Sequence, residues 1–463
     1  MTDAVATRSA VELADAVRTG AVSSRDLLAT FVDRIERLGT PINAVVTFDL
    51  DRARDAAARA DDALARGDVR GPLHGLPVTI KDAIATAGIR STGGAVELKD
   101  HVPAEDAPAV ARLKQAGAVV FGKTNLPRWS GDLQSFNEMF GTTNNPWATD
   151  RVPGGSSGGA AAATACGFTS FELGTDIGGS VRVPSHFCGV FGLKPSYGVI
   201  PQRGYLDHVG AGVNDADINV FGPIARSAED LDLLLGVLAG PPPEQAPAWR
   251  LEPPPARGAA LADYRIGAWF DEPACPVASD YRGVLQATAD RLADAGAKIS
   301  EAHPPVDFAD QVGLFHQLIS PAISISFDGA VGESLGGNHR HWLLAQERRA
   351  ALQRTWAEWF ESYDLLLCPV TPTAAFPHDQ EGDFFSRTIS VDGADRPYVE
   401  NVSWTGLIGV VGLPSAVPPL RRTAGGLPVG VQVVAPFLRD RDAVRAAGVI
   451  AEVAGGYEPP PGF

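Results

Sequence analysis

A dense run of glycine and serine between residues 141 and 210 constrains this chain of 463 residues more than any other feature. Glycine occupies 14 of those 70 positions and gathers in two clusters, Pro153–Gly159 (PGGSSGG) and Gly174–Arg182 (GTDIGGSVR). Four consecutive alanines from Ala160 favour a helix directly after the first cluster. The first cluster is therefore predicted to be a loop that enters a helix and presents backbone N–H groups with a partial positive charge.

The composition argues against several classes of protein. Hydrophobic residues make up 45% of the chain and charged residues 20%, as in ordinary globular proteins. The formal net charge of −16 argues against a nucleic-acid partner, because phosphate contacts need a basic surface. The four cysteines form no CxxC pair, so we expect neither a zinc site nor disulfides, and a cytoplasmic location. No apolar run reaches the roughly 18 residues of a membrane span, so we expect no membrane partner.

Short apolar runs alternate with helical patterns along most of the chain. Such runs cover residues 76–80, 118–121 and 190–193, whereas the N-terminus carries helix-capping serines at Ser9 and Ser23 and a third helical pattern over about residues 50–65. The alternation predicts an α/β fold whose core is a large mixed, mostly parallel β-sheet, covered by helices on both faces. We expect a single domain, 1–463, with these parts: N-terminal helices (1–66), a core that carries both glycine clusters (70–240), a proline-rich connector (241–258), an appended βα/helical lobe (259–390) and a return to the core (391–463).

Two generic motifs each have a competing interpretation. Residues 117–124 match the phosphate-binding pattern GxxxxGK[ST], but the middle residues, AVVF, favour a strand rather than a flexible loop. Residues 154–158 match GxSxG, which would make Ser156 a nucleophile with His186 or His208 as its base. That arrangement needs a strand leading directly into Gly154, whereas residues 145–153 predict a loop.

The order of several segments along nearly the whole chain resembles the amidase signature family. The segments are residues 75–82 (GLPVTIKD), the two glycine–serine clusters, 189–196 (GVFGLKPS), 221–227 (FGPIARS), 363–372 and 426–432 (GLPVGVQ). The resemblance implies the amidase signature fold and a Ser–cis-Ser–Lys triad, with Ser180 as nucleophile, Ser156 as bridging serine and Lys81 as base. It also implies a cis peptide bond between Gly155 and Ser156, and an oxyanion hole in the stretch Ile177, Gly178, Gly179 and Ser180.

The chemistry of these residues agrees with the resemblance. Serine is a weak nucleophile that needs a base, and a lysine serves as that base only when it is neutral, which burial favours. Only six of the 39 basic residues are lysine, and Lys81 ends the apolar run 76–80. Asp176 and Arg182 flank the expected nucleophile, and we interpret them as structural supports that pair with each other.

The resemblance implies a hydrolase of linear carboxylic amides, which forms an acyl-enzyme on serine and releases a carboxylic acid plus ammonia or an amine. Aromatic residues before the first glycine cluster are candidates for lining the substrate pocket: Trp129, Phe136, Phe140 and Trp147. We expect a small-molecule amide as substrate and neither a metal nor an organic cofactor, and we leave a homodimer open. Two alternatives also stay open: the glutaminase (A-type) subunit of a tRNA-dependent amidotransferase, and a catalytically silent binding protein on the same scaffold.

Overall fold

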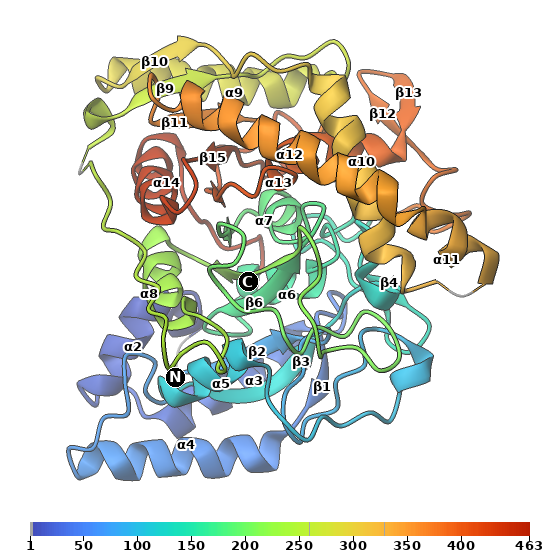
Figure 1. Cartoon of the computed structure of the whole chain (residues 1–463). Coiled ribbons are helices and arrows are strands. Elements are labelled where there is room, and N and C mark those ends of the chain that lie inside the picture. Colours follow the sequence, from blue (N-terminus) through green and yellow to red (C-terminus); the bar gives the residue numbers. More distant parts are fainter. Residues whose placement is uncertain (1–2, 259, 328) are drawn as a thin grey trace.

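The computed structural model describes residues 3–258, 260–327 and 329–463. Its main element is an eight-stranded sheet with the order β10-β9-β11-β15-β14-β7-β8-β6. The strands of this sheet are β6 (Glu172–Asp176), β7 (Phe191–Lys194), β8 (Val220–Ala225), β9 (Arg265–Ala268), β10 (Lys298–Glu301), β11 (Leu365–Cys368), β14 (Ser415–Val417) and β15 (Gln432–Val434). Helices flank the sheet, with α9, α10 and α12 at the top of the view in Figure 1.

The mixed α/β sheet is confirmed, but its pairing is not mostly parallel. Only the β10–β9 and β9–β11 pairs are parallel, and the remaining neighbouring pairs of this sheet are antiparallel. A parallel pair needs a long crossover, usually a helix, and α9 (Ser279–Asp294) supplies it between β9 and β10. The segments that join β7 to β8 and β14 to β15 contain no helix, so these strands run in opposite directions.

A second sheet, in the order β1-β3-β2, carries the N-terminal part of the site. Its strands are β1 (Val45–Phe48), β2 (Pro77–Lys81) and β3 (Val119–Thr124). The parallel strands β2 and β3 are joined through α5 (Pro108–Gln115). The GxxxxGK[ST] match therefore lies in a turn and a buried strand, as predicted.

The N-terminal helices lie low in Figure 1, beside this smaller sheet. They are α1 (Asp3–Ala6), α2 (Ala10–Arg18), α3 (Ser24–Leu38) and α4 (Leu50–Ala65). Ser9 and Ser23 cap α2 and α3 as predicted, because their hydroxyls accept from the backbone N–H groups of Glu12 and Asp26.

The remaining elements complete the shell around the larger sheet. The helices are α6 (Gly158–Ala165), α7 (Arg182–Cys188), α8 (Ala228–Leu238), α10 (Phe308–Ser324), α11 (Gly329–Gly336), α12 (His339–Trp359), α13 (Ser403–Gly409) and α14 (Asp440–Ala454). Short hairpins join β4 (Phe136–Asn137) to β5 (Gly141–Thr142) and β12 (Thr388–Val391) to β13 (Ala394–Pro397). Single 3₁₀ turns cover Val96–Leu98, Arg128–Ser130, Leu261–Asp263 and Tyr398–Val402.

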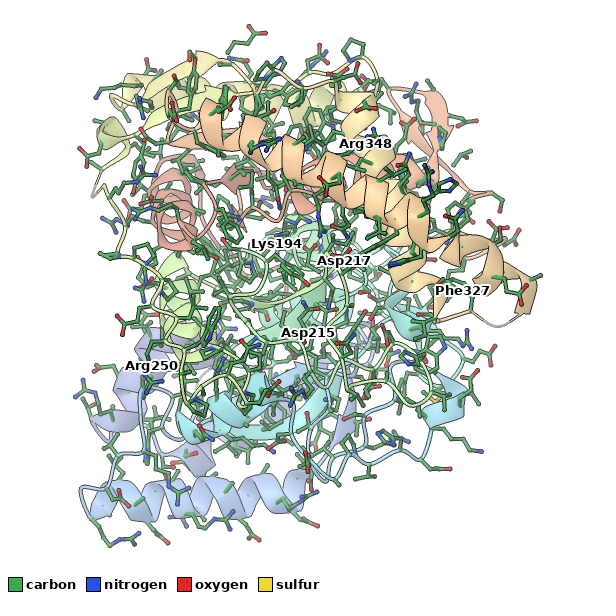
Figure 2. The ribbon with its side chains drawn as sticks, in the orientation of Figure 1. Lys194, Asp215, Asp217, Arg250, Phe327 and Arg348 are labelled. Atoms are coloured by element: carbon green, nitrogen blue, oxygen red, sulfur yellow. The ribbon has the colours of Figure 1, made fainter. Side chains whose placement is uncertain are left out.

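The long segment between β7 and β8 is fastened to α12. Arg349 and Gln346 of α12 donate to the carboxylate of Asp217, each at 2.8 Å. Figure 2 labels Asp217 near the middle of the view, below α12. The attachment anchors this segment, whose Tyr205 and Asp207 line the cavity described below.

Candidate active site

Lys81 ends β2 with its side chain fully buried. Its Nζ lies 2.6 Å from Ser156 Oγ and 2.7 Å from Thr175 Oγ1. Burial lowers the pKa of Lys81 well below its usual range, and the charges of Asp176 and Glu172 only partly oppose that shift. A neutral amine keeps a lone pair, so it can accept the Ser156 proton while it donates to Thr175.

Ser156 lies in the loop that enters α6, and the peptide bond between Gly155 and Ser156 is cis. Glycine is required at the preceding position, because a Cβ on Gly155 would come within 2.5 Å of the backbone carbon of Leu133. The helix after this loop consists of glycine, alanine and threonine and is buried on all sides. These small residues let the loop sit deep enough for Ser156 to meet Lys81.

Ser180 follows β6 and lies on the wall of a cavity near this site. Its backbone carbonyl accepts from the N–H of Ser157 at 3.2 Å, which ties the second glycine cluster to the first. Among the described residues no hydrogen bond joins the hydroxyls of Ser156 and Ser180. The Lys81–Ser156 half of the expected relay is thus in hydrogen-bonding geometry, and Ser180 lies on the cavity wall.

Of the four N–H groups expected to form the oxyanion hole, one has Asp176 as its acceptor and three have none among the described residues. Gly179 donates its N–H to Asp176 Oδ1 at 2.9 Å, so this donor is occupied rather than free for a ligand. Ile177, Gly178 and Ser180 line the cavity, and their N–H groups meet no acceptor among the described residues. A Cβ on Gly178 would lie 3.5 Å from side chains of Ile319 and Val402, which is an ordinary van der Waals distance.

Asp176 and Arg182 form a buried ion pair, as predicted. Arg182 donates to both carboxylate oxygens of Asp176 and also to Thr405 O and Gln432 Oε1. Burial alone would raise the pKa of Asp176, but the Arg182 charge and hydrogen bonds hold it at about 2. The carboxylate thus organises the loop through N–H groups on both sides of Ser180.

The two histidines considered as bases for Ser156 have other partners. His186 is fully buried, its Nδ1 accepts from Gly430 N–H at 2.7 Å, and its Nε2 lies 3.1 Å from Thr373 O. His208 lies 2.7 Å from the carboxylate of its neighbour Asp207. Residues 146–150 and 152–153 contain no strand, so the segment before Gly154 is the predicted loop. The geometry therefore favours Lys81 over either histidine as the base.

The cavity beside Ser180 has a volume of about 210 Å³ and a mostly apolar lining. Helix α10 supplies one wall through Phe315, Ile319 and Ile323, which recur at intervals of four residues on one face. Phe384 and Val402 line another part. Phe327, labelled in Figure 2 between α10 and α11, is part of the lining and is 40% exposed.

Of the aromatic candidates, only Trp129 lines this cavity. Phe136 lies in β4, Phe140 packs under the guanidinium of Arg90, and Trp147 borders a separate cavity. Helix α10 was not among the predicted pocket elements, although the spacing of Phe315, Ile319 and Ile323 carries the signal. It could not be assigned because the sequence does not tell which apolar helical face turns toward the site.

Comparison with known proteins now identifies the class. A family model described as Amidase matches residues 26–320 and 330–444, and the chain belongs to this family, the amidase signature family. The chain is 33% identical to the A-type subunit of glutamyl-tRNA(Gln) amidotransferase from Roseiflexus sp. strain RS-1, over 91% of each chain. It is 32% identical to the protein of the same name from Heliobacterium modesticaldum, over 93% of this chain and 94% of that one.

Solved structures agree on the fold. One, from a vestigial protein complex that bears on the origins of an s-triazine catabolic enzyme, superposes with a TM-score of 0.85 at 28% identity. The match covers 98% of this chain and all of that one. The amidase signature fold is therefore confirmed.

The comparisons also overturn one expectation. The net charge argued against nucleic acid, yet the relatives that match over nine tenths of the chain are named as subunits of an amidotransferase for glutamyl-tRNA(Gln). Net charge failed as a guide because it sums over the surface and says nothing about what a complex as a whole binds. No helix of the described residues is long and apolar enough to cross a membrane, and those residues contain no cluster of three metal-ligating side chains.

Proposed function

We propose that this amidase-family enzyme hydrolyses a carboxylic amide through an acyl-enzyme on Ser180. The observation that carries the proposal is the 2.6 Å contact between Lys81 Nζ and Ser156 Oγ in a fully buried site. A buried lysine with a lowered pKa is able to accept a proton at neutral pH, as a general base must.

The steps follow from the positions of the groups. Ser180 Oγ attacks the amide carbon, its proton passes to Ser156, and the Ser156 proton passes to Lys81. The N–H groups of Ile177, Gly178 and Ser180 face the developing oxyanion, and each such donor is worth about 3 kcal/mol in known enzymes. The Lys81 proton then returns through Ser156 to the leaving nitrogen, and water, activated by the same relay, cleaves the ester.

The lining of the cavity supports an amide with an apolar acyl group. Phe315, Ile319 and Ile323 offer dispersion contacts, and the charged lining residues Arg128, Asp132 and Asp207 already have partners in Glu97, Arg387 and His208. Ammonia or amine release should therefore be faster from aliphatic or aryl amides than from glutamine, whose α-amino and α-carboxylate groups need polar partners. A panel of such amides with the purified chain tests this: preference for glutamine would contradict it.

A second candidate is the glutaminase subunit of a tRNA-dependent amidotransferase. The names of the relatives favour this candidate over a free amidase. It predicts a stable partner in stoichiometric amount and ammonia release from glutamine that depends on that partner. Purification of the untagged native complex decides: full amidase activity of the chain alone would exclude the candidate.

The silent binding protein is the weakest of the alternatives, since Lys81, Ser156 and Ser180 are all present near the cavity.

We also propose a reducing, cytoplasmic location. The four cysteines support it, because each is free and buried. A fraction-resolved immunoblot of the source cells, with a disulfide-sensitive mobility assay, would test the location.

A further inference from the structure

Glu172 is a buried carboxyl group that the proposed mechanism does not use. It opens β6, the strand that leads to Ser180, and its side chain is fully buried. Neither of its carboxyl oxygens has a hydrogen-bond partner among the described residues. The hydroxyls of Thr79 and Thr124, buried nearby, also lack a partner in good geometry.

These groups lie beside the proposed base. Thr79 and Lys81 share one face of β2, two residues apart, and Thr124 of β3 is the register partner of Lys81. Strand β2 packs against β6, which brings Glu172 to this cluster. A carboxylate in a dry interior with no ion pair and no hydrogen bond in good geometry is strongly disfavoured, so the group is expected to carry a proton.

We propose that Glu172 is a positioning residue of the catalytic centre: as a neutral carboxylic acid it keeps negative charge away from Lys81, which leaves the lysine unprotonated and ready to act as base. An ionised Glu172 would stabilise the ammonium form of Lys81 and remove the lone pair that accepts the Ser156 proton. The inference rests on the proposed role of Lys81.

The charges around the cluster agree with this assignment. Burial raises the pKa of Glu172 to about 8, against the opposing effects of Thr79, Thr124 and Lys123. Besides Glu172, the charge of the Asp176 carboxylate acts on Lys81, and Arg182 keeps this carboxylate ionised.

Lys123 reaches the cluster from β3 and has further charged neighbours. Its pKa falls to about 8 through burial, and the groups that act on it are Asp82, Glu172, Lys114 and Asp106. Its Nζ donates to Ile84 O at 2.5 Å and to Thr86 Oγ1 at 2.9 Å, which holds the ammonium away from Glu172 without a direct bond.

The first test measures stability and needs no substrate. A carboxyl group whose pKa rises from 4.5 to about 8 on folding stabilises the protein below pH 4.5, and this contribution is lost as the pH rises through 8. Glu172→Gln removes the titration, so the melting temperature of the variant relative to wild type should rise steadily between about pH 5 and 8.5. A difference that stays flat or falls with pH overturns the proposal.

The second test measures catalysis. Lys81 sees a neutral neighbour in both wild type and Glu172→Gln, so the acid limb of the kcat/KM profile should stay in place. A shift of that limb to lower pH by about one unit or more, a tenfold change in the Lys81 equilibrium, means that Glu172 is ionised and overturns the proposal. If the chain shows no amidase activity at all, the proposed function fails while the stability test still decides the state of Glu172.

A matched control is Asp230→Asn. Asp230 is a buried carboxyl group of α8, far from Lys81 in the sequence, and it accepts a hydrogen bond from the N–H of Val11. Burial raises the pKa of Asp230 too, so the melting temperature of this variant relative to wild type should also rise with pH, while its kcat/KM profile should not move.

If Glu172→Gln does not fold, wild type labelled with ¹³C at glutamate side chains replaces it. Glu172 is the one fully buried glutamate in the described chain, and its protonated-carboxyl infrared band should vanish near pH 8. Absence of that band at pH 7 overturns the proposal.

Discussion

At the scale of single residues, the site depends on a lysine that the fold removes completely from water. The hydroxyl groups around Lys81 form hydrogen bonds with its amine, and no carboxylate is in contact with it among the described residues. Lys194, labelled in Figure 2, is buried as well, yet its Nζ donates to the carbonyl oxygens of Pro195 and Leu413. The chemistry thus follows from the partner of each lysine rather than from burial alone.

Lys81→Met should lower kcat/KM by about 10²–10⁴-fold, because it removes the general base while methionine fills a similar volume. Steady-state kinetics with the best amide of the panel measure the loss. Lys194→Met is the matched control: we expect it to lower the melting temperature but to retain turnover. Equal activity of Lys81→Met and wild type would contradict the assignment.

The pH dependence of activity has a defined sign. Lys81 acts only when neutral, so kcat/KM should rise with pH and level off well below the usual pKa of lysine of 10.5. The same shift means that folding stability falls as the pH drops from 10.5 toward the lowered pKa, because over that range Lys81 takes up a proton in the unfolded chain but not in the folded one. A kcat/KM profile that is still rising at about pH 10 would show that Lys81 is not the base.

At the scale of elements, two short junctions determine the site. The junction between β6 and α7 is held by hydrogen bonds to the Asp176 carboxylate on both sides of Ser180. The loop before α6 places Ser156 beside Lys81 of β2. Both junctions were predictable from local sequence, because the clustered glycines and the small residues after them determine backbone conformation over only a few positions. Helix α10 could not be placed in the same way, because Ile319 of this helix and Gly178, which line the same cavity, are about 140 positions apart in the chain.

Asp176→Asn tests the β6–α7 junction. Breaking a buried ion pair costs about 3–5 kcal/mol, so the free energy of unfolding at pH 7 should fall by that amount. The pKa of Asp176 drops from 3.8 to about 2 on folding, so its contribution is present above pH 3.8 and is lost as the pH falls through 2. Urea unfolding should therefore show a gap between wild type and variant that narrows toward pH 2. A gap independent of pH would contradict this prediction.

Ile319→Ala tests the wall of the cavity made by α10. Loss of the apolar contact should raise KM for an apolar amide by about tenfold with little change in kcat, within the roughly 1–3 kcal/mol of a small hydrophobic change. Gln317→Ala is the control on the exposed face of the same helix, where Gln317 accepts from Arg348. Equal KM values for both variants would remove α10 from the substrate site.

At the scale of the whole molecule, the fold brings together Lys81, Ser156 and Ser180, the proposed base, bridging serine and nucleophile, from three separate strand ends and loops. The order of motifs allowed the family, the triad residues and the α/β class to be predicted from the sequence. Strand direction was not predictable, because it depends on which strands become neighbours, and the β7–β8 and β14–β15 connections contain no helix. The lining of the cavity also depends on long-range packing.

The most direct test of the central claim is to locate the covalent adduct of a fluorophosphonate probe by peptide mass spectrometry. We expect labelling at Ser180 in wild type, and a large loss of labelling in Lys81→Met with the fold retained. An adduct at Ser156, or none in active enzyme, would contradict the assignment of Ser180 as the nucleophile.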